Sequence, residues 1–189
     1  MFHLHPLHIS QNPYPYARIL ELMKTTYYWT VAERTALEKI SSWDDMIPVA
    51  LGILRRMSAL EKPIVQICGP MTTGGRGSLA ANMAFFKRAQ LVASNHGLVI
   101  FDQTPFQDAM IRLSSEWGKR QEYCTPILEV FYRGVFQSGH VSALYFLPGW
   151  EGSVGSRWER EEGARLSLTI LEYPMEWLHL IETSSVLRV

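Results

Sequence analysis

Short apolar runs that alternate with helix-length segments constrain the fold of this chain more than any other feature of its sequence. The runs lie at residues 64–68 (IVQIC), 98–101 (LVIF), 142–147 (SALYFL) and 167–171 (SLTIL). Strands that alternate with helices are typical of a parallel sheet that helices cover on both faces. The sequence therefore predicts an α/β fold with a parallel sheet. Its helices are expected at 78–97, 105–120, 127–136, 157–166 and 175–181.

Residues 1–60 have a different pattern and predict a helical N-terminal extension ahead of an α/β domain at 61–189. Thr30 and Glu33 have the spacing of a capping box at the start of a helix. The first residues are rich in proline, which favours an extended segment that lies on the surface or on a partner subunit. Helices of the extension are expected at 16–28, 30–40 and 43–60.

The composition fits a compact protein and argues against several classes of partner. Hydrophobic residues make up 47% of the 189 residues, and 18 basic residues balance 18 acidic ones. A formal charge of zero argues against nucleic acid polymers and acidic membrane surfaces as partners. The two cysteines, the lack of a signal-peptide pattern and the lack of a bilayer-spanning apolar run predict a cytoplasmic protein without membrane contact.

Histidines do not predict a metal site in this chain. His3, His5 and His8 lie close together, but no nearby Cys, Asp or Glu completes a recognisable ligand set. We therefore expect neither a metal nor a cofactor.

The loop after the first apolar run, GPMTTGGRG at 69–77, predicts a binding site for an anion or a sugar. Its glycines leave backbone N–H groups accessible just before a helix that Ser78 is expected to cap. The spacing of a Walker A loop or a dinucleotide fingerprint is absent, and a purely structural turn is the alternative. The candidate binding residues are Gly69, Pro70, Met71, Thr72, Thr73, Gly74, Gly75 and Arg76.

Glu159 is the candidate catalytic residue because it follows the third apolar run, in the first turn of the expected helix. Open α/β folds bind small molecules beside the carboxyl ends of their strands. The alternative is a capping box in which Glu159 only accepts a hydrogen bond from the backbone of Ser156. At least one of Glu161 and Glu162 is expected on a solvated face.

Further candidate binding residues surround the same crevice. Asp102 and Gln103 follow the second apolar run and would hold sugar hydroxyls or a base, or else cap the following turn. Two tryptophans of the third loop would stack on a nucleobase or pack in the core. The candidates in that loop and the next helix are Gly149, Trp150, Ser153 and Trp158.

Together these motifs resemble the nucleoside 2-deoxyribosyltransferase superfamily, especially its small members with a GPM start and an LPGWE centre, which are related to nucleotide N-glycoside hydrolases. The resemblance covers about residues 63–173 and is carried by ICGPM at 67–71, NHGLVI at 95–100 and ALYFLPGWE with GSRWE at 143–159. In that superfamily the glutamate on the helix after the central glycine turn is the nucleophile. Glu159 falls on this position. We predict a flavodoxin-like three-layer sandwich.

The resemblance also implies a reaction, in which Glu159 attacks the anomeric carbon of a nucleoside or nucleoside 5′-monophosphate and water or a second base resolves the glycosyl-enzyme. The loop at 69–77 would bind the 5′ end of the sugar. The family's aspartate is missing from 131–140, so Asp102 or Asp108 would replace it, and Asp102 is our candidate. A homodimer or larger homo-oligomer is implied. The alternative is a non-catalytic nucleotide-binding or interaction module on the same fold.

Overall fold

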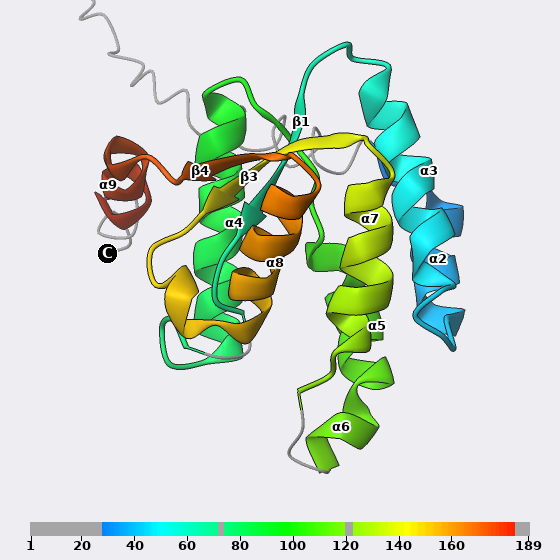
Figure 1. Cartoon of the computed structure of the whole chain (residues 1–189). Helices are drawn as coiled ribbons and strands as arrows, with labels where there is room; N and C mark the ends of the chain where they lie inside the picture. Colours follow the sequence, from blue (N-terminus) through cyan, green and yellow to red (C-terminus); the bar gives the residue numbers. More distant parts are fainter. Residues whose placement is uncertain (1–27, 72–73, 120–122, 184–189) are drawn as a thin grey trace, which may run out of the picture.

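A four-stranded, all-parallel sheet with the strand order β2-β1-β3-β4 forms the centre of the molecule (Figure 1). The computed structural model describes residues 28–71, 74–119 and 123–183. The strand order is that of a flavodoxin-like three-layer sandwich, so the predicted fold class is confirmed. The strands are β1 (Ile64–Cys68), β2 (Val99–Ile100), β3 (Val141–Phe146) and β4 (Thr169–Glu172).

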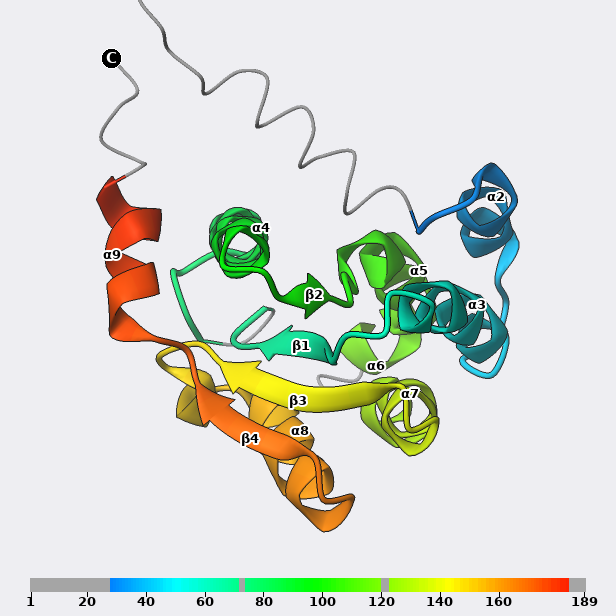
Figure 2. The same cartoon turned by 90° about the horizontal axis from the view of Figure 1, so that it is seen from above.

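Helices cover both faces of the sheet (Figure 2). The helix α4 packs on β1, β2 and α9, whereas α8 packs on β3 and β4. Within the described residues, no helix combines the length and the apolar character that crossing a bilayer requires. The helices are α2 (Val31–Lys39), α3 (Met46–Ser58), α4 (Leu79–Asn95), α5 (Gln107–Leu113), α6 (Ser115–Lys119), α7 (Arg133–Gln137), α8 (Val154–Arg165) and α9 (Met175–Thr183). The shorter turns are η1 (Thr104–Phe106), the π-helical η2 (Ile127–Tyr132) and η3 (Trp150–Gly152).

The first strand, β1, separates two hydrophobic cores. All five of its side chains are buried, and successive side chains of a strand point to opposite faces of the sheet. Ile64 and Cys68 belong to the core beneath α3, η2 and α7, whereas Val65 and Ile67 belong to the core beneath α4 and α9. The same alternation places Gln66 on the face of Ile64 and Cys68, which is the face that α8 covers.

The described part of the expected N-terminal extension packs into the first of these cores. The capping box is confirmed, because Thr30 N donates to Glu33 Oε2 at 2.8 Å and Glu33 N donates to Thr30 Oγ1 at 3.1 Å. Met46 and Leu54 of α3 are fully buried in the same cluster as Phe131. The proline-rich segment and all but the last residue of the helix expected at 16–28 lie outside the described residues.

The start of α8 differs from the sequence prediction. The helix begins at Val154 because Ser153 is its cap, with extended backbone angles and a side-chain oxygen that accepts from Ser156 N at 3.3 Å. The predicted start at residue 157 is therefore wrong, Glu159 lies in the second turn, and the alternative of a capping box at Ser156 and Glu159 is contradicted as well. Two other predicted helices are subdivided, one into η1, α5 and α6 and one into η2 and α7.

Candidate active site

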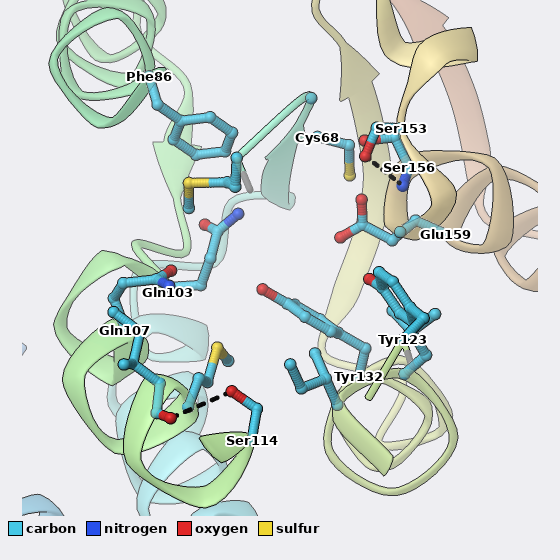
Figure 3. A pocket seen from close by; sticks show the side chains of 17 residues that line it. Cys68, Phe86, Gln103, Gln107, Ser114, Tyr123, Tyr132, Ser153, Ser156 and Glu159 are labelled. Atoms are coloured by element: carbon cyan, nitrogen blue, oxygen red, sulfur yellow. Dashed lines mark hydrogen bonds between the residues drawn. The ribbon is translucent and has the colours of Figure 1, made fainter. Parts of the chain in front are cut away.

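A pocket lies at the carboxyl ends of β1 and β3. One wall carries Glu159 and two tyrosines, and the opposite wall carries Gln103, Gln107 and Ser114 (Figure 3). The centres of water molecules have about 100 Å³ available inside it, several times the space that one water needs. Among the described residues that line the pocket, Glu159 is the only Asp, Glu, Lys, Arg or His. Its polar lining residues are Cys68, Gln103, Gln107, Ser114, Tyr123, Tyr132, Ser153, Ser156 and Glu159.

Glu159 is buried without a cationic partner in this lining. Its side chain is only 6% exposed, and Gln66 Nε2 donates to its Oε1 at 2.9 Å. Burial raises the pKa of Glu159 to about 8, although hydrogen bonds with the Cys68 thiol and the Gln66 amide favour the charged form. A carboxyl group that exchanges its proton near neutral pH and faces a pocket is suited to chemistry.

Gln66 and Cys68 are site residues that the sequence analysis did not assign. Gln66 Nε2 also lies 3.6 Å from Cys68 Sγ, so the two side chains surround the Glu159 carboxyl from the β1 side. Burial and the nearby Glu159 charge raise the pKa of the Cys68 thiol, which makes it a donor rather than a nucleophile. The sequence did offer one signal for Gln66, which is an amide side chain within an otherwise apolar strand. A buried amide needs a hydrogen-bond partner, so such a residue indicates a polar contact inside the protein.

Two tyrosines close the same wall from η2 and the segment before it. Tyr123 and Tyr132 both lie beside Glu159 (Figure 3). Burial, and secondarily the Glu159 charge, raises the pKa of Tyr123 to about 12 and that of Tyr132 well above its usual range, so both remain hydrogen-bond donors at neutral pH. A Cβ atom at Gly155 would lie 2.8 Å from Tyr123 Oη, so the glycine permits this approach. In the sequence alone, Tyr123 and Tyr132 indicate only packing in the core.

The glycine-rich loop contributes its beginning to the pocket. Gly69 and Met71 line it, and Gly69 is required where a Cβ atom would meet Leu147 Cβ at 2.9 Å. Asn82 of α4 holds the rest of the loop, because its Nδ2 donates to Met71 O at 2.8 Å and its Oδ1 accepts from Arg76 N at 2.6 Å. Thr72 and Thr73 lie outside the described residues.

The later loop residues form a separate hollow in front of α4. Gly74 and Gly75 line this hollow together with Ser78, and Gly75 needs its positive φ of 73° where Asn82 approaches. The Arg76 guanidinium lies 3.9 Å from the centre of the Phe85 ring and 3.7 Å from Glu182. Pro70 packs against Gly75. Much of the hydrogen bonding and packing of this loop is therefore internal to the protein, as the alternative of a purely structural turn predicts.

Several predicted site residues have structural contacts instead of a place in the pocket. Asp102 Oδ1 accepts from Thr104 N at 2.9 Å and so caps the next turn. The ring of Trp150 lies edge-on to Phe146, and Trp158 stacks on a core phenylalanine. Gln103 does line the pocket, and its Nε2 donates to Ile67 O at 2.9 Å. Those that do not line this pocket are Pro70, Gly74, Gly75, Arg76, Asp102, Gly149, Trp150 and Trp158.

Comparisons with known proteins give the pocket no independent assignment. No family model matches the chain, and neither a curated protein nor a solved structure matches it significantly. In the part of the chain that the structure describes, no group of three or more His, Cys, Asp or Glu side chains is placed to hold a metal ion. The family resemblance stays a prediction from the sequence motifs, and the site is interpreted from its own geometry.

Proposed function

We propose that the pocket is the active site of an enzyme that cleaves or exchanges the N-glycosidic bond of a nucleoside or nucleoside 5′-monophosphate. The observation that carries this proposal is Glu159, a buried carboxyl group that faces the pocket and has only neutral hydrogen-bond donors. The motif resemblance supports the choice of reaction, because it places the nucleophile at the same residue.

In the proposed reaction the Glu159 carboxylate attacks the anomeric carbon while the bond to the base breaks. The base leaves with the bonding electrons and takes up a proton, and water or a second base then attacks the glycosyl ester and frees Glu159. Positive charge develops on the sugar in the transition state, and a buried carboxylate stabilises it strongly. Asp102 caps a turn outside the pocket, so we assign it no part in the reaction.

The protonation state of Glu159 separates this role from general acid catalysis. A nucleophile must be charged, and the pKa of Glu159 in the empty pocket is about 8. We therefore expect kcat/KM to rise with pH through this value, because kcat/KM reports the free enzyme. A general acid would give a falling profile over the same range.

The direct test is incubation of the protein with the common ribonucleosides, their 2′-deoxy counterparts and the 5′-monophosphates of both, with chromatographic detection of free base. Glu161 is exposed on the same helix and supplies a matched control. The proposal predicts release by the wild type and by Glu161→Gln, and none by Glu159→Gln. Equal release by Glu159→Gln contradicts it. Saturable binding without release favours the non-catalytic binding module, since the described lining holds a single carboxyl group.

A further inference from the structure

Two buried polar atoms beside Glu159 have no hydrogen-bond partner within the described residues. They are Ser156 Oγ and Gln66 Oε1, on side chains that are 1% and 0% exposed. Buried polar groups in native proteins are almost always paired, so an unpaired one at a pocket indicates a bound molecule or a catalytic role. Ser156 also lines the pocket. The site therefore has unused hydrogen-bonding capacity next to its carboxyl group.

The helix α8 directs Ser156 and Glu159 toward the same space. The two residues are three positions apart in the sequence, a spacing that brings side chains to one helix face with Cβ atoms about 5–6 Å apart. Both lie on the same wall of the pocket (Figure 3). The neighbouring Ser153 is not equivalent, because its hydroxyl oxygen already accepts from Ser156 N.

We propose that Ser156 binds the 2′-hydroxyl of a ribose, so that the pocket acts on ribonucleosides or ribonucleotides in preference to their 2′-deoxy counterparts. This inference rests on the proposed function. In a β-nucleoside the base leaves from one face of the sugar ring, and the nucleophile attacks from the other. The 2′-hydroxyl of ribose projects from the attacked face, on the carbon next to the reacting one. A donor one helical turn from the nucleophile is placed to reach it.

The unpaired state of Ser156 gives the preference its energetic basis. A ribose would pair with the buried hydroxyl, whereas a 2′-deoxyribose offers it no partner. Sites built to bind a substrate hydroxyl reject the analogue that lacks it, and hydrogen bonds to this hydroxyl strengthen in glycosidic transition states. We expect kcat/KM to favour the ribonucleoside at least about tenfold over the 2′-deoxynucleoside with the same base.

The test compares three sugars that carry one base: ribose, 2′-deoxyribose and 3′-deoxyribose. Wild-type protein is expected to discriminate against the 2′-deoxy sugar, and Ser156→Ala to reduce that ratio to within about threefold. The variant should also melt at a higher temperature, because it removes an unpaired buried hydroxyl and places a better helix former in α8. Ser142→Ala is the matched control, since Ser142 Oγ donates to Ile64 O at the far end of the sheet.

Binding of the same compounds to the Glu159→Gln variant, measured by calorimetry, tests the sugar preference without turnover. Ribose-selective binding without base release by the wild type overturns the proposed function and leaves this inference standing. Base release with no ribose preference, or with a preference that Ser156→Ala leaves intact, overturns the inference alone. Stronger dependence on the 3′-hydroxyl than on the 2′-hydroxyl also overturns it, as does failure to bind any of these sugars.

Discussion

The two buried glutamates of α8 have the same exposure and opposite surroundings. Glu159 and Glu162 are each 6% exposed. Glu162 accepts from Arg165 Nη2 at 2.6 Å and from Arg133 Nε at 3.1 Å, and these arginines, Arg165 first, lower its pKa. Glu159 has only neutral donors, and burial raises its pKa to about 8. Solvent exposure therefore does not distinguish these two carboxyl groups, whereas the presence of cationic partners does.

Two glycines of α8, Gly155 and Gly163, also differ in their surroundings. A Cβ atom at Gly155 would meet the hydroxyl of Tyr123 in the pocket, whereas a Cβ atom at Gly163 would meet Leu144 Cδ1 at 2.6 Å in the core. The first half of α8 thus lines the pocket, and the second half packs against β3 and β4. Substitutions in the two halves are expected to change different properties.

The largest expected effect is on turnover. Glu159→Gln should lower kcat/KM on the best nucleoside substrate at least about a thousandfold, because the amide cannot form the glycosyl ester. Glu162→Gln should stay within about threefold of the wild type, since it changes only structural ion pairs. Steady-state kinetics measures both. A comparable loss in the two variants would remove the distinction between the two halves of α8.

The next effect concerns stability and has opposite signs for the two carboxyl groups. The pKa of folded Glu159 lies above the ordinary 4.5, so its contribution to the free energy of unfolding falls as pH rises from 4.5 to about 8, by up to about 1.4 kcal/mol per pH unit. The pKa of folded Glu162 is lowered, so its contribution is present above 4.5 and is lost as pH falls below that value.

Urea unfolding at a series of pH values checks these slopes. Glu159→Gln should flatten the decline between pH 4.5 and about 8, whereas Glu162→Gln should reduce only the loss on the acid side. Identical pH dependences for Glu159→Gln and the wild type would show that Glu159 is not a buried, cation-free carboxyl group.

The glycine pair should give smaller effects. Gly163→Ala is expected to lower the free energy of unfolding by about 1 kcal/mol, because overpacking of the core outweighs the higher helix propensity of alanine. Gly155→Ala should leave stability nearly unchanged but lower kcat/KM about tenfold by displacing Tyr123. Denaturant titration and kinetics on both variants test this, and a Gly155→Ala variant with full activity would exclude a role for Tyr123.

The smallest effect is expected from Arg165→Gln. The Arg165 side chain is 58% exposed, and Glu162 keeps Arg133 as a partner. Melting temperature should fall less than for Gly163→Ala, and the difference should shrink in high salt because exposed ion pairs are screened. A large, salt-independent loss would mean that Arg165 has a role beyond this ion pair.

The sequence was sufficient to predict the strand pattern. It was not sufficient to decide which of two neighbouring cap-forming residues begins a helix. The first strand was predicted with its observed bounds, because IVQIC is apolar and ends at glycine. Ser153 and Ser156 are both cap-forming residues, and only the chain path after Gly149 decides which of them begins α8. The same limit explains why the capping-box interpretation of Glu159 was wrong.

The candidate site was predicted in part for a similar reason. The position of Glu159 follows from strand topology, but its partners come from distant parts of the chain. Gln66 precedes it by 93 residues, and Tyr123 reaches it only because Gly155 lies opposite. Asp102 has the expected place after a strand, yet its carboxylate satisfies the nearest backbone N–H. Such pairings depend on tertiary contacts that no local pattern specifies.

Mass spectrometry of an acid-quenched reaction tests the role of Glu159 most directly. With the best substrate of the nucleoside panel, we expect the protein mass to increase by one sugar residue, and the proteolytic peptide that contains Glu159 to carry the addition. The addition should be absent from Glu159→Gln. Base release with the sugar attached to a different residue, or with the same addition in Glu159→Gln, would contradict the assignment of Glu159 as the nucleophile.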